Sequence, residues 1–344
     1  TTGLGADAIG LQERGFRVLA SDLDLLTAQI AGFNLGAVAG SRTPARAFAA
    51  DATHPPLATG LGELLLLFDP DRRALESSNT RGRPGGGRRR LDPASFSPPL
   101  TEWGALLASV AGAAIKLPPG LDPASLEESG PLAAFLERTP HRWTWTESGG
   151  ELRELTLWTG QLAPPGEAPR TAVRVFGPGL PPSGEDPVAA QLSGQPEGQH
   201  FGELPDPETL TWIAEARPSA RRSGLAGTAC RAALPSATPI DEGLSYWATS
   251  QAEAPSAPTD FADVFQVLAS APLDKKHARR MLREHDVGPL TVKKRGLDES
   301  SATLASRIAL KTGRPGLVIA TPTRSGRRLF LVERLARNAE ESPT

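Results

Sequence analysis

Glycines and a carboxylate near the start of the chain have the spacing of a nucleotide-binding site. Gly3 and Gly5 form a turn that runs directly into a predicted helix at 6–14. Glycine lets the backbone approach a ligand closely, and the first N–H groups of a helix are free to donate hydrogen bonds to it. Asp22 follows Gly5 by about 17 residues, at the end of the next predicted strand, where a carboxylate can bind both hydroxyls of a ribose.

Two further acids end predicted strands in the same way. Asp51, followed by Ala52, is placed to accept the amino group of an adenine, and Asp69 is followed by Pro70. Each acid taken alone is explained as well by an ordinary N-cap or loop carboxylate. The carboxyl ends of parallel strands meet at the crevice where α/β sheets bind ligands. The three acids and the glycine turn together therefore indicate a nucleotide-type ligand.

The elements that must position these residues alternate between helix and strand. Apolar strands are predicted at 17–21, 45–50 and 64–68, with helices between them. Continuous apolar strands separated by helices indicate a mostly parallel sheet that is covered on both faces. Later in the chain, the pattern predicts a helix at 103–111 and strands at 113–117, 142–146 and 171–176, and it leaves the type of 151–161 open.

Two predicted elements have a clear apolar side. The second predicted helix, over 25–35, places Leu26, Ile30 and Phe33 on one face. Trp143 and Trp145 alternate along a predicted strand and therefore face the same side, which favours core packing over a ligand contact.

A second unit is predicted beyond a stretch rich in proline and glycine at 177–199. A helix at 260–270 would carry Phe261, Val264 and Phe265 on one side, whereas 217–260 shows no regular pattern. The other elements expected here are helices at 207–216, 273–285 and 300–310, a strand at 290–294, and a hairpin of strands at 317–321 and 328–333.

Composition limits the class of protein. With 344 residues and 39% hydrophobic residues the chain can form about two globular domains with real cores. The most apolar run, Leu61–Phe68, is far shorter than the roughly 20 residues that a membrane span needs. A single cysteine excludes an intrachain disulfide and fits a reducing cytoplasm, and the five histidines lack the spacing of metal ligands, so no metal is expected.

Charge is strongly segregated although the net charge is only −2. Residues 273–344 hold 16 Lys and Arg against 8 Asp and Glu, and residues 72–90 hold seven arginines against one acid. The middle, at 91–272, is acidic, with 22 acids against 10 basic residues. Such basic segments can steer a polyanion, although a solvated basic face explains them equally well.

At these residues the chain resembles class I S-adenosylmethionine-dependent methyltransferases, in the order TGLGADA, VLASDLD, ADAT and LLLFDPDRR. The resemblance is closest to a bacterial subgroup with a C-terminal THUMP-like domain, and it covers nearly the whole chain. The segments that carry it are DPDRR at 69–73, GRRRLDP at 87–93, FSPPL at 96–100, IKLPPGL at 115–121 and LTVKKRG at 290–296.

The resemblance implies a Rossmann-like fold and S-adenosylmethionine as methyl donor, with no metal. Transfer from an activated sulfonium is an in-line displacement, for which positioning supplies much of the acceleration. Related amino-methylating enzymes have an aromatic residue after their Asp-Pro segment, and its absence here leaves the methylated atom open. The residues implied to bind the donor are Gly3, Gly5, Asp7, Asp22, Asp51 and Ala52, and those implied in catalysis are Asp69 and Pro70.

THUMP domains bind RNA, so the resemblance implies structured tRNA or rRNA as the substrate. Arg72 and Arg73 could grip a phosphate, although an ion pair within the domain explains them nearly as well. Lys293, Lys294 and Arg295 follow a strand, in a position suited to a phosphate contact. Two other functions stay open: a non-catalytic RNA-binding scaffold that retains the fold, and a small-molecule methyltransferase.

The domain boundaries follow from these motifs. We expect a methyltransferase domain at 1–178, a linker at 179–206 and a C-terminal region at 207–344, with the THUMP-like domain at about 260–338. In the family, the glycine turn follows the first, central strand of the sheet, whereas here it begins at Thr1. We therefore expect the chain to begin inside the fold, with Thr1 at the carboxyl edge of the sheet.

Overall fold

The computed structural model describes residues 2–37, 45–52, 61–70, 92–100, 103–128, 130–166, 168–176, 189–197, 206–241, 243–251 and 259–336. Contacts divide the chain into two compact units, residues 1–171 with 175–189 and residues 172–174 with 190–344. No helix in the described ranges is long and apolar enough to cross a membrane.

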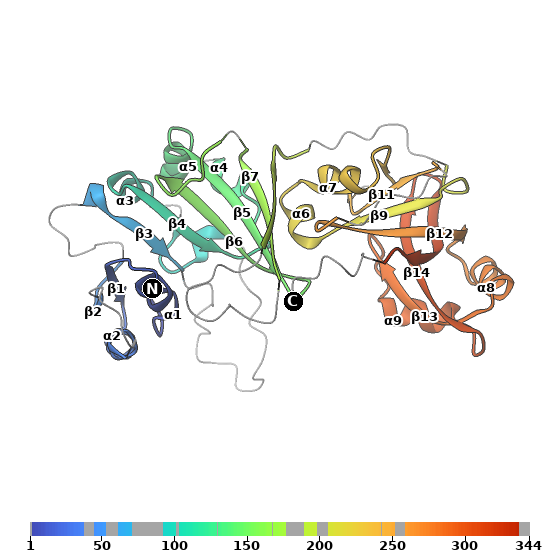
Figure 1. The fold of residues 1–344 in the computed structure, drawn as a ribbon, viewed down its shortest axis with the longest axis horizontal. Helices are drawn as coiled ribbons and strands as arrows, with labels where there is room; N and C mark the ends of the chain where they lie inside the picture. Colours follow the sequence, from blue (N-terminus) through green and yellow to red (C-terminus); the bar gives the residue numbers. More distant parts are fainter. Residues whose placement is uncertain are drawn as a thin grey trace. The chain divides into compact units, whose positions relative to one another are not determined.

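The first unit opens with the helix–strand alternation that the sequence predicts (Figure 1). Its elements are α1 (Ala6–Glu13), β1 (Val18–Asp22), α2 (Leu25–Gly36) and β2 (Ala45–Ala49). The two strands pair in parallel, with Val18 opposite Ala45 and Asp22 opposite Ala49. This register places the ends of β1 and β2 at one edge.

Helix α2 buries a different face from the large apolar side chains that the sequence pattern groups together. Its buried residues are Ala28, Ala31 and Leu35. By contrast, Leu26 is 63% exposed and Phe33 is 78% exposed. The small side chains let α2 approach β2 closely, and Gly32 would bring an added Cβ to within 3.6 Å of Ala47. Close packing, rather than the size of the apolar residues, therefore decides which face is covered.

The larger sheet of the first unit has the order β3-β4-β6-β5-β7-β8. Strand β3 (Leu65–Phe68) runs parallel to β4 (Gly112–Leu117), whereas β6 (Glu151–Gly160) is antiparallel to both β4 and β5 (His141–Ser148). The segment whose type the sequence left open is thus the central strand β6. The remaining elements are η1 (Leu61–Glu63), η2 (Pro93–Ser95), α3 (Gly104–Ser109), α4 (Ala124–Glu127) and α5 (Gly130–Leu136). The last two strands of the sheet are β7 (Arg170–Val175) and β8 (Ala189–Gly194), whose residues 172–174 and 190–194 are assigned to the second unit. Strand β8 forms inside the expected linker.

The core of this sheet contains both tryptophans of the RWTWT strand. Trp143 and Trp145 are each 1% exposed, so the expected core packing is confirmed. The FSPPL motif serves the same core, since Phe96 and Leu100 are buried in the cluster that contains these tryptophans. Asp92 of the preceding motif caps η2 by accepting the N–H of Ala94. In these two motifs, the residues described here contribute to packing and capping.

The second unit contains a seven-stranded sheet of order β10-β11-β9-β12-β15-β14-β13. Strands β12, β15 and β14 are consecutive antiparallel neighbours, and β13 adds to β14 in parallel. The strands are β9 (Trp212–Ala216), β10 (Thr238–Pro239), β11 (Tyr246–Thr249), β12 (Ala262–Pro272), β13 (Val287–Lys294), β14 (Arg314–Thr323) and β15 (Gly326–Arg334). The helices are α6 (Pro218–Arg222), α7 (Ala226–Ala233), α8 (Lys275–Glu284) and α9 (Ser301–Ile308).

Three predictions in this unit are wrong. The helix expected at 207–216 is strand β9, all five residues of which are buried. The helix expected at 260–270 is strand β12, which lies between β9 and β15. The region expected to be irregular at 217–260 contains α6, α7, β10 and β11. Short apolar runs that are buried on both sides have no alternation, so periodicity cannot distinguish them from a buried helix.

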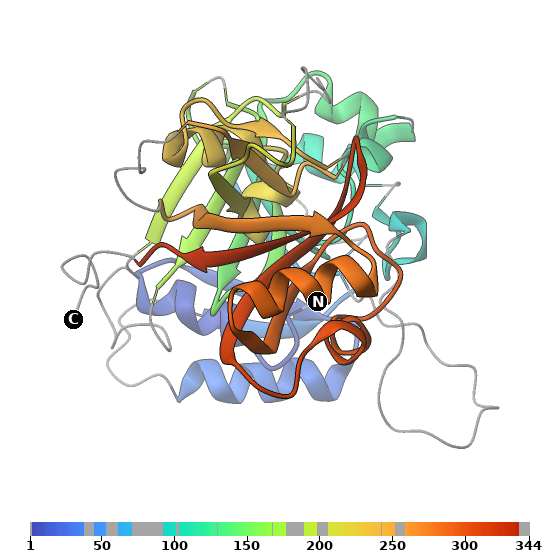
Figure 2. The ribbon, with the colours of Figure 1, turned by 90° about the vertical axis from the view of Figure 1, so that its right-hand side faces the viewer.

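The basic helix and the C-terminal hairpin are where the sequence places them. Helices α8 and α9, coloured orange, lie against one face of the C-terminal strands (Figure 2). Helix α8 buries Ala278, Met281 and Leu282 against that face. Asp274 caps the helix by accepting the N–H groups of Lys276 and His277. Its Lys and Arg residues other than Arg279 are left exposed on the outer face.

Candidate functional site

The glycine turn is held against the end of β1 by backbone hydrogen bonds. The Thr2 N–H donates to the Ser21 carbonyl at 2.9 Å, and the Gly3 N–H donates to Asp22 Oδ2 at 3.1 Å. Gly3 has a φ of 54°, a conformation that favours glycine, and an added Cβ would meet no atom within 4 Å. Thr1 itself lies outside the described residues. The turn therefore presents open backbone beside a fixed carboxylate.

The second glycine starts helix α1. Gly5 is its N-cap, with a φ of 90°, and an added Cβ would lie 3.4 Å from the Cβ of Ala31 on α2. This position thus needs glycine both for its backbone conformation and for the close approach of the two helices. The free N–H groups in the first turn of α1 are the donors that an anionic or polar ligand group can use.

Asp22 and Asp24 have different roles although they are two residues apart. Asp24 caps α2 by accepting the N–H and the hydroxyl of Thr27, each at 2.7 Å. Asp22 accepts the N–H of Gly3 on one oxygen and that of Asp24 on the other. A carboxylate has about four acceptor positions, so two are left for a ligand.

Asp51 and Asp69 lie at the ends of their strands, as the sequence predicts. Asp51 is exposed and follows β2 by two residues, beyond Ala49, the residue that pairs with Asp22. Ala52 packs partly against the core of the larger sheet. Asp69 directly follows β3 and is half-buried. Pro70 is buried, so its ring packs inside the protein and is not part of the exposed surface.

An aromatic pair fixes the end of β3. Phe68, the residue before Asp69, stacks on Trp103 with ring centroids 3.7 Å apart and an interplanar angle of 21°. Both rings are 2% exposed. The aromatic residue that related amino-methylating enzymes have after their Asp-Pro segment is absent from this sequence, and the stacked ring here belongs to the residue before Asp69.

The sequence analysis assigned no role to one lysine, which binds an acid just after the glycine turn. Lys116 lies near the end of β4, in the position that follows the Phe68–Ile115 pair and is therefore level with Asp69. Its Nζ donates to Asp7 Oδ1 at 2.7 Å. A charged residue inside the otherwise apolar strand GAAIKL was the signal that could have identified it.

The surroundings of Lys116 favour its charged form. Burial lowers the pKa of its ammonium group, but the hydrogen bond and charge of Asp7, with the charges of Glu154 and Asp69, outweigh this and raise the pKa above its usual value. Lys116 therefore stays protonated. Asp7 binds Lys116 directly, whereas Asp69, level with it at the end of β3, acts on it through its charge.

The residues predicted to contact the substrate are placed unevenly. Arg72 and Arg73 lie outside the described residues. Lys293 donates to Glu215, and Lys294 donates to the Leu297 carbonyl at 2.7 Å. Arg295 also binds Glu215, with its Nη2 at 3.3 Å from Oε1. All three basic residues of the LTVKKRG motif therefore have hydrogen-bond partners within the second unit.

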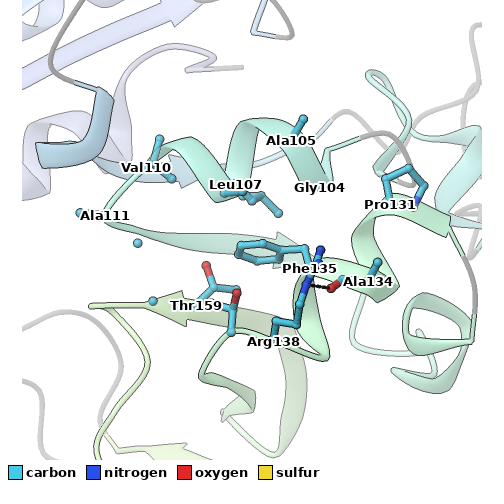
Figure 3. Close-up of a pocket in the computed structure, with 14 residues that line it drawn as sticks. Gly104, Ala105, Leu107, Val110, Ala111, Pro131, Ala134, Phe135, Arg138 and Thr159 are labelled. Carbon is cyan, nitrogen blue, oxygen red and sulfur yellow. Dashed lines mark hydrogen bonds between the residues drawn. The ribbon is translucent and has the colours of Figure 1, made fainter.

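The first unit also has a cavity of about 530 Å³, drawn in Figure 3, which lies away from these residues. It is lined by Leu107 and Phe135, and Arg138 at its rim donates its Nε to the Ala134 carbonyl at 3.0 Å. Gly112, which begins β4, also lines it, whereas Asp69 and Lys116 lie near the carboxyl ends of β3 and β4. The cavity is therefore at the opposite end of the parallel strands from the candidate site.

Comparisons with known proteins relate the chain to methyltransferases. An "uncharacterized S-adenosylmethionine-dependent methyltransferase" of Mycobacterium tuberculosis, from strains CDC 1551 and H37Rv, is 25% identical over 330 residues, which are 95% of this chain and 77% of the relative. The crystal structure of a "putative methyltransferase" from Porphyromonas gingivalis W83 covers 98% of this chain and 76% of its own, with a TM-score of 0.65 and 14% identity, so the two share a fold. A family described as THUMP domain-like matches residues 262–334. The chain is therefore a homologue of S-adenosylmethionine-dependent methyltransferases with a THUMP-like domain near its C-terminal end, as its motifs indicated.

Proposed function

We propose that this protein transfers a methyl group from S-adenosylmethionine to RNA. The observation that carries the proposal is the set of hydrogen bonds around the glycine turn. Asp22 binds the backbone of Gly3, the turn leads into Asp7, and Asp7 binds Lys116 on β4. Asp69, the proposed catalytic acid, is level with Lys116 at the end of the neighbouring strand β3.

The residues present suit an S-adenosylmethionine molecule. The open space beside Gly3 accommodates a ligand against the backbone, and the two unused acceptor positions of Asp22 suit the paired hydroxyls of a ribose. Asp51, next along the same edge, is placed for the adenine amino group. When bound, the donor supplies a methyl group already activated by its sulfonium charge.

The chain's own part in the reaction is to hold groups in place. The Phe68–Trp103 stack fixes the backbone at Asp69, and Lys116 fixes Asp7 relative to β4. Such positioning is the main contribution that an enzyme makes to a displacement of this type. If the target is an amine, the carboxylate of Asp69 orients it and accepts its proton.

RNA as the acceptor is supported by the second unit. THUMP domains bind RNA in the family that this chain resembles, and residues 262–334 match a THUMP domain-like family. Helix α8 leaves Lys275, Lys276, Arg280 and Arg283 exposed on its outer face, which is suited to phosphate contacts.

Donor binding is tested first, by calorimetric titration of the full chain with S-adenosylmethionine. We expect Asp22→Asn to weaken binding about 10- to 100-fold, because hydrogen bonds to a charged group are worth about 1.5–3 kcal/mol. Glu13→Gln is the matched control, since it removes the same charge from an exposed position on α1. Equal binding by the wild type and Asp22→Asn would contradict the assigned site.

The acceptor is tested separately, with a donor carrying a labelled methyl group and cellular RNA. We expect label that enters the polymer fraction and is released by ribonuclease. Label found only in small molecules would contradict the RNA assignment while leaving the methyltransferase assignment intact. Bound donor with no transfer to any acceptor would favour the alternative of a scaffold that retains the fold.

A further inference from the structure

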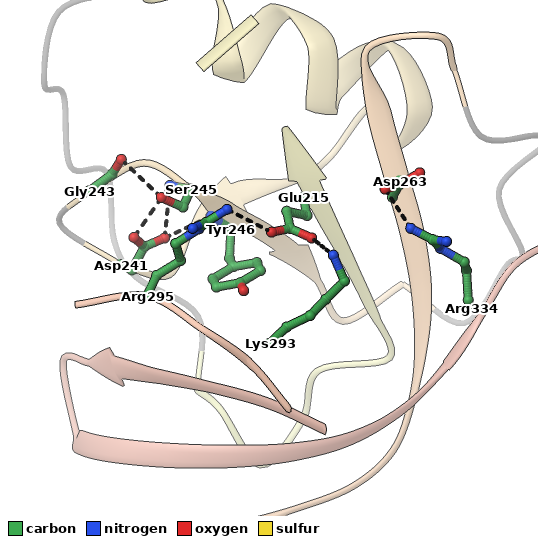
Figure 4. Close-up of polar contacts among 9 residues, drawn as sticks. All are labelled: Glu215, Asp241, Gly243, Ser245, Tyr246, Asp263, Lys293, Arg295 and Arg334. Atoms are coloured by element: carbon green, nitrogen blue, oxygen red, sulfur yellow. Dashed lines mark hydrogen bonds and ion pairs between the residues drawn. The ribbon is translucent and has the colours of Figure 1, made fainter. Parts of the chain in front are cut away.

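The second unit contains a pocket of about 580 Å³ whose charged lining is mostly arginine. Arg221 and Arg222 come from the end of α6, and Arg295 follows β13. Sequence reasoning selected only Arg295, because Arg221 and Arg222 lie in a region without regular pattern. Figure 4 shows Arg295 between the carboxylates of Glu215 and Asp241, together with the residues that hydrogen-bond to each carboxylate.

The acids near this pocket are already engaged. Asp241, which lines the pocket, accepts the Ser245 N–H at 3.0 Å and the Tyr246 N–H at 2.7 Å on the same oxygen. Glu215 is 9% exposed and binds both Lys293 and Arg295. Among the described residues that line the pocket, three guanidinium groups therefore face one carboxylate, which leaves an excess of positive charge.

The arginines have donors to spare. Within the described part of the chain, neither Arg221 nor Arg222 makes a hydrogen bond or ion pair with another side chain, and Nε of Arg221 and of Arg295 is buried without a partner. Burial and the charges of Arg295 and Arg222 lower the pKa of Arg221, which shows that these cations are crowded together. An anion placed among them satisfies the donors and relieves the repulsion.

We propose that this pocket binds a phosphate group. Three guanidinium groups provide several N–H donors in planar forks, the geometry that binds phosphate oxygens two at a time. The phosphate belongs either to an RNA backbone or to a small phosphorylated molecule. The inference goes beyond the proposed function, because it concerns a different unit and does not depend on the methyl donor.

The test uses two probes with the full chain: inorganic pyrophosphate by calorimetry and a fluorescein-labelled RNA hairpin by anisotropy. The central variant is Arg222→Gln, whose side chain is exposed, so that the fold is retained. Arg314→Gln is the matched control, because it removes the same charge from an exposed position at the start of β14, whereas Pro322 near the end of that strand lines the pocket. Arg221→Lys keeps the charge but removes the fork, and thermal melting checks that each variant is folded.

We expect Arg222→Gln to weaken pyrophosphate binding about tenfold and Arg314→Gln to leave it unchanged. If Arg222→Gln also weakens hairpin binding and lowers its salt slope by about 1, the phosphate comes from RNA. If only pyrophosphate binding is lost, the pocket serves a small phosphorylated molecule. Absence of pyrophosphate binding to the wild type, or equal losses in Arg222→Gln and Arg314→Gln, would overturn the proposal.

Discussion

The two polar sites of this protein hold their charges in opposite ways. In the first unit, Asp7 is exposed and Asp22 half-buried, and their partners are backbone N–H groups and a single lysine. In the second, Glu215 is nearly buried and binds Lys293 and Arg295. Exposed pairs contribute about 0–1 kcal/mol to stability, whereas breaking a buried pair costs several. The first site can therefore be changed with little effect on folding, and the second cannot.

The strongest test of this contrast is Glu215→Gln. We expect it to destabilise the second unit by about 3 kcal/mol, at the lower end for buried pairs because Lys293 and Arg295 are partly exposed. Hydrogen exchange of the β9 and β13 amides measures the loss. Glu333→Gln, an exposed acid on β15, is the control and should change protection little. Equal effects of the two variants would show that the Glu215 contacts are not stabilising.

The corresponding change in the first unit is Lys116→Met. We expect turnover to fall about tenfold, because small displacements of positioning groups have large kinetic effects. Stability should fall by less than about 1 kcal/mol, since the Lys116–Asp7 pair is partly exposed. Lys116→Arg should recover part of the turnover, and steady-state kinetics with chemical denaturation separates the two effects. A large loss of stability with unchanged turnover would make Lys116 a structural residue.

A third ion pair, between His141 and Glu127 in the first unit, makes stability depend on pH. The hydrogen bond to Glu127, aided by the Thr139 carbonyl and the Glu127 charge, raises the pKa of His141 despite its burial. A group whose pKa is raised on folding stabilises the protein below its unfolded pKa and loses that effect as the pH rises through its folded value. We expect His141→Gln to lower stability at about pH 6 and to match the wild type at about pH 9. Denaturation midpoints measured across this range provide the test, and a difference independent of pH would contradict it.

The smallest effect is expected on the exposed face of α2. Phe33→Ser should change stability by less than about 0.5 kcal/mol, because Phe33 is 78% exposed. Leu35→Ala, on the buried face of the same helix, should cost about 3 kcal/mol. Thermal melting of the two variants distinguishes the faces. A larger loss for Phe33→Ser would mean that this face is covered in the folded protein.

The first unit was predicted better than the second for a physical reason. Gly3, Gly5 and Asp22 act through local turns and strand ends, which short stretches of sequence encode. Strands β9 and β12 are buried in the sheet and carry no alternation, so β12 resembled a helix with Phe261 and Val264 on one side. Their strand character comes from pairing: β9 pairs with β12, and β12 also pairs with β15. In each case the partner strand lies far away in the sequence.

By itself, the sequence determined the glycine turn, the acids that end the strands and the relationship to methyltransferases, because each depends on residues close together in the chain. Only the tertiary structure decided that Lys116 joins Asp7 across 109 positions and that Arg295 meets Arg221 and Arg222 at one pocket. Charges interact through space and are screened by their surroundings, so their partners are known only once the sheets have brought distant segments together.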